Sequence, residues 1–242
     1  MNLIAYDGIT TGRIEPRNNL GLGPGNRADV MIQAPLEPGT YVLLKRELGV
    51  GKNNTEVFPD ILTKVVVEGA RLDMVLPTER ELAPLAPFAS LADLPETAID
   101  NHHTATFLFY PQPPQKEFLG MGFDGDSTRF DTSTMEHMFL NAIKLTLGDI
   151  DEWTLQIRDN GKTQSAHPFH IHVNPFQVTK LDGQSLEHPR WQDTILLTPG
   201  HTITFRTQYT VFEGMFVFHC HFLDHEDLGM MRLVDIVRSP SN

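Results

Sequence analysis

Short runs rich in β-branched and aromatic residues recur along the whole chain, and this pattern restricts the fold more than any other feature. Turn residues separate the runs, as in the segment 21–26 (GLGPGN) and at Pro199-Gly200. Regularly spaced short strands with turn signals between them are typical of a β-sandwich or barrel. Few segments have a helical period, so we expect an all-β protein. The clearest predicted strands are 28–33, 40–44, 104–110, 153–157, 194–197, 202–206 and 215–218.

The chain is long enough for two small domains, and its composition changes near the middle. The 242 residues can bury a core without disulfides. Three prolines and little periodicity follow Leu82, so we predict an ordered linker at 82–103 between units at 1–81 and 104–242. A second irregular stretch, 111–131, contains PQPPQ and GFDGDS, and we interpret it as a long loop.

Charge and composition exclude several classes of function. Asp and Glu number 31 against 19 Lys and Arg, which gives a net charge of −12. Such a chain repels nucleic acid and attracts cations, including metal ions. The single cysteine excludes an intrachain disulfide. No apolar run is long enough to span a bilayer, and the first residues (MNLIAYDGIT) do not resemble a signal peptide.

Six of the eleven histidines, together with the only cysteine, fall in two short segments. The second of these segments reads HCHFLDHEDLGMM from His219 to Met231. Side chains alternate between the two faces of a strand, so His219 and His221 share one face while Cys220 points to the other.

The first segment, HPFHIH, follows the same rule. His170 and His172 share one face, and His167 has the opposite parity. Two sites are therefore predicted back to back on neighbouring strands. One contains Cys220 and His167, and the other contains His170, His172, His219 and His221.

The chemistry of these side chains favours copper. His225 and Met230 follow Cys220 within one turn or loop. A thiolate, two imidazoles and a weak thioether form the ligand set of a blue copper site, and a face of imidazoles suits further copper. Zinc is an alternative because His221 and His225 lie four residues apart, but Phe222 stands where the zinc protease motif has Glu. A core of clustered histidines without metal is the remaining alternative.

The strings HPFHIHVNPFQV and FHCHFLDHEDLGMM resemble the two C-terminal copper-binding signatures of the multicopper oxidases, the laccase-like family. Residues 104–242 resemble the family's last cupredoxin domain nearly end to end. Residues 1–80 resemble the later part of its middle domain through AYDGIT, LGPGNRADVMIQA and PGTYVLL. The resemblance implies a cupredoxin-like Greek-key β-sandwich, with one complete domain at 104–242 preceded by a partial, copper-free cupredoxin domain at 1–81.

The resemblance also implies a ligand assignment. The type 1 copper would be held by His167, Cys220, His225 and Met230. The type 2 copper would be held by His170, and the type 3 pair by His172, His219 and His221. The family's trinuclear cluster uses eight histidines, four of them from His-x-His motifs in an N-terminal domain. This chain lacks those motifs, so we expect the other half of the cluster from an N-terminal segment absent from this chain or from a partner chain.

The function implied by the resemblance is a copper-dependent oxidase, with four coppers in the complete enzyme. It would take single electrons from phenols, aromatic amines or low-valent metal ions and reduce dioxygen to water. The chain alone is expected to have little or no oxidase activity. Because family members are mostly exported, the resemblance implies a periplasmic or secreted protein with no membrane span.

The alternative function is a blue copper electron-transfer module without oxygen chemistry, for which the Cys220 site alone suffices. Such a module has no need of histidines on both sides of Cys220, so the His-Cys-His triplet favours oxygen reduction. Copper nitrite reductases resemble this fold but do not usually flank their cysteine in this way.

Three further positions have open interpretations. Glu226 follows His225 and could pass protons during oxygen reduction, as a neighbouring acid does in the family, or it is a loop carboxylate. Asp193 could orient a ligand histidine or contact substrate, although a hydrogen bond at the start of a strand is favoured. His103 is expected at the surface.

Overall fold

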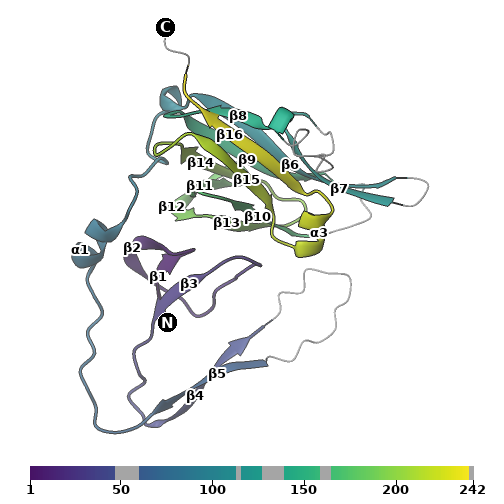
Figure 1. The fold of residues 1–242 in the computed structure, drawn as a ribbon. Coiled ribbons are helices and arrows are strands. Elements are labelled where there is room, and N and C mark those ends of the chain that lie inside the picture. Colours follow the sequence, from purple (N-terminus) through teal and green to yellow (C-terminus); the bar gives the residue numbers. More distant parts are fainter. Residues whose placement is uncertain (47–59, 113–115, 127–138, 159–164, 240–242) are drawn as a thin grey trace. The chain divides into compact units, whose positions relative to one another are not determined.

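The computed structural model describes residues 1–46, 60–112, 116–126, 139–158 and 165–239. Most of the regular structure in these residues is β-strand (Figure 1), which confirms the all-β prediction. Each of the seven predicted strands overlaps an observed one. The chain forms two compact units, the first from Met1–Gly21 and Ala28–Pro87 and the second from Leu22–Arg27 and Phe88–Asn242. In the described residues no helix is long and apolar enough to cross a membrane.

The first unit contains two small antiparallel sheets. Strands β1 (Asn2–Tyr6), β2 (Ile9–Pro16) and β3 (Ala28–Met31) form one sheet in the order β2-β1-β3. Asp7 and Gly8 join β1 to β2 with positive φ angles of 52° and 80°, the backbone that a tight two-residue hairpin requires.

The second sheet of this unit has only two strands. Among the described residues, strands β4 (Gly39–Lys45) and β5 (Asp60–Val67) pair only with each other, and most of their residues are exposed. The unit ends in the short helices α1 (Glu79–Leu82) and η1 (Ala83–Leu85). Thr78 and Glu81 form a capping box at the start of α1.

The second unit is a sandwich of two sheets. The five-stranded sheet has the order β13-β10-β15-β16-β8, with bounds Thr194–Leu197, His167–Ile171, Gly214–Cys220, Met231–Val237 and Ile143–Thr146. The six-stranded sheet has the order β12-β11-β14-β9-β6-β7, with bounds Gln184–Gln192, Phe176–Leu181, Ile203–Gln208, Ile150–Arg158, Asn101–Gln112 and Lys116–Phe123. Short helices in the described part of this unit include η2 (Glu96–Ala98) and α3 (Leu223–Asp227).

Aromatic side chains from both sheets fill the core of the sandwich. Trp153 on β9 meets Phe218 on β15 edge to face, with ring centroids 5.4 Å apart. Phe169 on β10 packs against Phe205 on β14 at 5.6 Å. All four side chains are fully buried. Inward-facing residues of two packed sheets are the expected core of a β-sandwich, so the cupredoxin-like expectation is confirmed for this unit.

One expectation about this unit was wrong. The stretch 111–131, interpreted as a long loop, contains strand β7, which pairs antiparallel with β6 from Ala105↔Phe123 to Gln112↔Lys116. The large side chains of Leu119, Met121 and Phe123 alternate with Gly120 and Gly122 and are buried, as the core face of a strand requires. The prolines and glycines in this stretch conceal that period. The parts of the stretch at 113–115 and 127–131 lie outside the described residues.

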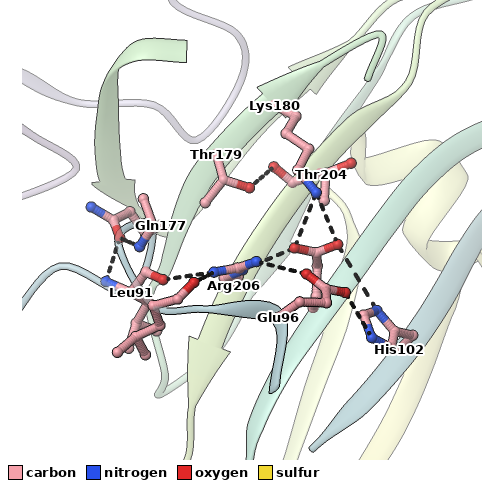
Figure 2. Close-up of polar contacts among 11 residues, drawn as sticks. Leu91, Glu96, His102, Gln177, Thr179, Lys180, Thr204 and Arg206 are labelled. Carbon is pink, nitrogen blue, oxygen red and sulfur yellow. Dashed lines mark hydrogen bonds and ion pairs between the residues drawn. The ribbon is translucent and has the colours of Figure 1, made fainter. Parts of the chain in front are cut away.

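The segment before β6 is fixed to the six-stranded sheet by one buried arginine. Arg206 on β14 donates to the carbonyls of Leu91 (3.0 Å) and Leu94 (2.8 Å), and it pairs with Glu96 (3.3 Å) and Glu152 (2.9 Å). Figure 2 shows this network. Burial alone would raise the pKa of Glu152, but hydrogen bonds from Arg206 and from Lys180 on β11 lower it. Ordered contacts therefore occupy part of the predicted linker 82–103, whose last residues already belong to β6.

Candidate metal centre

The two histidine segments lie on neighbouring strands. Strands β10 and β15 are antiparallel, with Phe169 opposite Cys220 and His170 opposite His219. Directly opposed residues present their side chains to the same face of a sheet. The pairing thus gathers histidines from both strands on one face.

The Cys220 side chain lies with two histidines in a buried corner of the sandwich. Its Sγ atom is 3.7 Å from Nδ1 of His167 and 3.6 Å from Nδ1 of His225, and the two Nδ1 atoms are 3.3 Å apart. His167 opens strand β10, Cys220 closes β15, and His225 sits on α3. The ring of Phe107 stacks on His167 with centroids 4.8 Å apart. These three ligands will be called the cysteine set.

The cysteine set has the size and chemistry of a metal site. A metal ion binds imidazole nitrogen at about 2.0 Å and thiolate sulfur at about 2.3 Å, so its ligand atoms lie roughly 3.3 to 3.7 Å from one another. Burial lowers the pKa of His167 to about 3, with a smaller contribution from His225, and it lowers the pKa of His225 as well. Both imidazoles are therefore neutral, the form that binds a metal. Burial raises the pKa of the Cys220 thiol to about 12, and a bound cation would reverse that cost.

Met230 is held in the same corner by its backbone. Its carbonyl accepts from the N–H of Cys220 at 3.0 Å, and its own N–H donates to the carbonyl of His225 at 3.0 Å. The side chain is fully buried. The sequence predicted four residues for this site. The nitrogen and sulfur atoms of three of them lie within 3.7 Å of one another, and the backbone of the fourth, Met230, is hydrogen-bonded to two of the three.

The other four predicted histidines gather on the opposite face of the strands. The Nε2 atoms of His172 and His219 are 3.1 Å apart, and His170 offers a nitrogen within 4.8 Å of both rings' ligand atoms. The ring centroid of His221 lies 5.4 Å from that of His170 and 5.5 Å from that of His219. We call these residues the four-histidine set.

Hydrogen bonds fix which nitrogen two of these rings can offer. Nδ1 of His219 lies 2.9 Å from the carbonyl of Cys220, and Nδ1 of His170 lies 2.9 Å from the carbonyl of Asp193. A carbonyl only accepts, so each Nδ1 carries the proton and each Nε2 of the neutral ring keeps a lone pair. Metal-binding histidines commonly donate their second ring N–H in this way. Burial is the largest cause that lowers the pKa values of His172 and His219, which favours the neutral rings. The four-histidine set therefore fits a metal ion.

Glu226 lies beside the four-histidine set. Its Oε2 atom is 3.3 Å from Nδ1 of His219, and its side chain is 27% exposed. Helix α3 carries both His225 and Glu226. His225 belongs to the cysteine set, and the next residue, Glu226, lies beside the four-histidine set. The carboxylate is therefore partly exposed to solvent and adjacent to a buried imidazole.

Sequence reasoning did not identify the loop Leu22–Arg27 as part of this centre. The Arg27 guanidinium forms two hydrogen bonds with the Asp193 carboxylate, at 2.9 and 2.7 Å. Burial alone would raise the pKa of Asp193, but hydrogen bonds from His170, Arg27 and Thr194 hold it well below its usual range. The turn signal GLGPGN was visible in the sequence, but nothing in it indicated a partner 166 residues away.

Another group of titratable side chains lies outside the centre. Glu96, His102 and Glu152 could each offer a ligand atom, but Arg206 and Lys180 already neutralise their charge (Figure 2).

The expectation that His103 lies at the surface was wrong. Its side chain is only 12% exposed, because β6 begins at Asn101 and includes this residue. The imidazole lies against the tilted ring of Phe123 at 4.9 Å and meets Trp153 edge to face at 5.4 Å.

Comparison with known proteins gives one family. The sequence model of the multicopper oxidase family matches residues 110–239. A laccase from Bacillus stratosphericus is 23% identical over 97% of this chain and 46% of its own length. The multicopper oxidase mco of Staphylococcus haemolyticus is 39% identical over 40% of this chain and 22% of its own length.

A solved structure described as a multicopper oxidase from Campylobacter jejuni, a metallo-oxidase, shares the fold. It has a TM-score of 0.70 at 22% identity and covers 97% of this chain and 48% of its own. The chain thus spans less than half the length of these relatives. The family match covers more than half of this chain and includes both ligand sets, and the chain belongs to the multicopper oxidase family.

Proposed function

We propose that this chain is the C-terminal part of a laccase-like oxidase that takes single electrons from a reducing substrate and transfers them to dioxygen. The observation that carries the proposal is the alternation of side chains at the end of strand β15. Cys220 belongs to the cysteine set, while its neighbours His219 and His221 belong to the four-histidine set. Copper bound at the two sets would supply one-electron redox chemistry and oxygen binding. Four one-electron oxidations, with four protons, balance the reduction of one dioxygen to two waters.

The cysteine set would hold the type 1 copper. His167, Cys220 and His225 would supply the three close ligand atoms, and Met230 would supply a weakly binding thioether. The four-histidine set would supply half of a trinuclear cluster. We assign His170 to the type 2 copper and His172, His219 and His221 to the type 3 pair.

The chain itself connects the two sets. One peptide bond joins Cys220 to His219, and the His219 Nδ1–H donates to the Cys220 carbonyl at 2.9 Å. An electron that leaves the cysteine set would therefore have a short path through bonds to the four-histidine set. Glu226, 3.3 Å from His219, would deliver protons for oxygen reduction.

The second half of the cluster would come from an N-terminal cupredoxin segment or from a partner chain. The first unit supports this because its small sheets leave apolar side chains open to solvent. Among them, Val42, Leu44, Ile61 and Val66 of the β4–β5 pair are 41–63% exposed. A two-stranded sheet of this kind is marginally stable by itself. We therefore treat residues 1–81 as part of a middle cupredoxin domain, 82–103 as its linker and 104–242 as the last domain.

The reducing substrate belongs to the classes that give up one electron at a time, namely phenols, aromatic amines or low-valent metal ions. The relatives described as a laccase and a metallo-oxidase are in keeping with this range. We also propose a periplasmic or secreted location, which suits such chemistry.

The test is the intact mass of the purified protein, measured together with copper per chain and oxygen uptake. A mass well above 27.3 kDa, about four coppers per molecule and oxygen uptake with a phenolic donor are expected. A mass of 27.3 kDa with one copper and no oxygen uptake would contradict the proposal. That result would support a blue copper electron-transfer module, because the cysteine set is complete within this chain.

A further inference from the structure

We propose that the loop Leu22–Arg27 is a positioning element for the four-histidine set. Arg27 holds His170 through Asp193, and Gly25 fixes the ring of His221. This inference rests on the proposed function in one respect, namely that the four-histidine set binds copper. The loop lies about 140 residues before the first of these histidines in the sequence, yet it packs with them in the second compact unit.

The first contact is an ion pair with fixed direction. Nη1 and Nη2 of Arg27 donate separately to Oδ1 and Oδ2 of Asp193, at 2.9 and 2.7 Å. Two parallel hydrogen bonds to a carboxylate restrict rotation as well as distance. Thr194 adds a third hydrogen bond to Oδ1 of Asp193, at 2.8 Å. The carboxylate is therefore held from both sides.

His170 takes its orientation from this anchored residue. Its Nδ1 atom lies 2.9 Å from the Asp193 carbonyl, 2.9 Å from the Thr194 hydroxyl and 3.5 Å from Oδ1 of Asp193. These acceptors keep the proton on Nδ1 and leave the Nε2 lone pair for a metal ion. Loss of the Arg27 contact would free the Asp193 carboxylate to turn and would loosen the tautomer of His170.

The loop is itself held rigidly against the same strand. The Asn26 side chain donates to the Thr194 carbonyl at 2.7 Å, and its Oδ1 accepts from the N–H of Gly23 at 3.0 Å. The Asn26 N–H also donates to the Gly23 carbonyl at 3.0 Å, which closes the turn. Asn26 therefore fixes where its neighbours Gly25 and Arg27 lie.

Gly25 touches the ring of His221. A Cβ added at this position would lie 2.5 Å from Cδ2 and 2.9 Å from Nε2 of His221, closer than any real side chain allows. The Gly25 φ angle of +86° is also one that favours glycine. This position therefore requires a residue without a side chain, and the backbone of Gly25 packs directly against the His221 imidazole. Two of the four histidines are consequently positioned by one loop.

The first measurement uses the metal-free full chain and does not depend on copper. Two-dimensional ¹H–¹⁵N spectra of the histidine rings report which ring nitrogen of each histidine is protonated. We expect one Nδ1–H tautomer for His170 in the wild type and mixed tautomers in Arg27→Ala. Arg27→Lys should restore the single tautomer only in part, because an ammonium group cannot form the two-pronged contact. An unchanged His170 tautomer in Arg27→Ala would overturn the inference whatever the fate of copper binding.

The second measurement titrates cupric ion into the full chain and follows the two ligand sets separately. Electron paramagnetic resonance detects copper bound by imidazoles alone, and the thiolate-to-copper absorption band reports the cysteine set. Arg27→Ala and Asp193→Asn should each weaken copper binding by the four-histidine set about ten- to a hundred-fold and leave the absorption band unchanged. Arg238→Ala removes an exposed arginine paired with Glu213, and this control should change neither signal.

The outcomes separate the inference from the function on which it rests. Equal losses at both sets, or no loss at the four-histidine set, would overturn the positioning role. Absence of copper from the wild-type four-histidine set would contradict the proposed function, while the tautomer measurement would still decide the role of Arg27. Gly25→Ala should weaken copper at the four-histidine set as Arg27→Ala does. If Gly25→Ala does not fold, Arg27→Ala alone decides the question.

Discussion

The Nε2 atoms of His172 and His219 face one another at 3.1 Å. The His219 proton is committed to the Cys220 carbonyl through Nδ1, so its Nε2 has only a lone pair to present to His172. A cation between or beside the two rings would satisfy both nitrogens. The same strand turns the thiol of Cys220 away from this pair, and the two ligand sets thus share one stretch of backbone.

Replacing the thiol tests the cysteine set. Cys220→Ser should abolish the thiolate-to-copper absorption band and lower the copper content by about one ion per chain, because a hydroxyl is a poor ligand where a soft thiolate is needed. Imidazole-bound copper, followed by electron paramagnetic resonance, should remain. Persistence of the band in Cys220→Ser would contradict the assignment.

Glu226 offers a test of proton delivery. Glu226→Gln keeps the size of the side chain but removes its ability to carry a proton to the imidazole of His219. In the assembled oxidase we expect unchanged copper content and a fall in oxygen uptake of about 100-fold. Glu213→Gln changes a carboxylate paired with Arg238 and is the matched control. Equal turnover in Glu226→Gln and wild type would leave Glu226 as a loop carboxylate only.

Arg206, the buried arginine on β14, should contribute strongly to the stability of the second unit, because it holds the segment before β6 against the six-stranded sheet. Arg206→Met leaves Glu152 buried with only Lys180 and His102 near it and removes hydrogen bonds to two backbone carbonyls (Figure 2). We expect the free energy of unfolding in urea to fall by about 3 kcal/mol. Arg238→Met, which breaks an exposed pair, should cost less than about 1 kcal/mol. A similar small effect from both variants would show that the buried network contributes little.

His103 should make stability depend on pH. Burial by itself would lower the pKa of its imidazole, but the carboxylates of Asp151 and Asp124 raise it above the usual 6.5. The folded protein therefore holds this proton more tightly than the unfolded chain. The resulting stabilisation is complete below the unfolded pKa and disappears as the pH rises through the folded one.

The measurement for His103 is thermal unfolding of the metal-free protein between about pH 6 and pH 9. The melting temperature of His103→Gln should fall further below that of the wild type at the acidic end of this pH range than at the alkaline end. His188→Gln changes an exposed histidine, 58% accessible, and should show no such difference. A constant gap between His103→Gln and wild type across the range would contradict the linkage.

The alternation of side chains along a strand predicted that the histidines and Cys220 divide into two sets on opposite faces. Alternation along 219–221 separates Cys220 from its two neighbours without any knowledge of tertiary structure, and the antiparallel partner β10 completes both sets. The stretch 111–131 was interpreted as a loop, and β7 was missed, because glycines separate the large side chains of the strand and prolines precede it. The ion pair of Arg27 with Asp193 joins residues 166 apart, and no local pattern encodes such a contact. The burial of His103 depends likewise on where β6 begins.

Anomalous X-ray diffraction on either side of the copper absorption edge, from crystals of the purified protein, tests the central claim most directly. We predict a copper peak inside the triangle formed by Cys220 Sγ, His167 Nδ1 and His225 Nδ1, whose sides measure 3.7, 3.6 and 3.3 Å. We also predict copper at the facing Nε2 atoms of His172 and His219. A triangle that contains zinc, or that stays empty while the thiol is intact and copper is supplied, would contradict the assignment of copper to this centre.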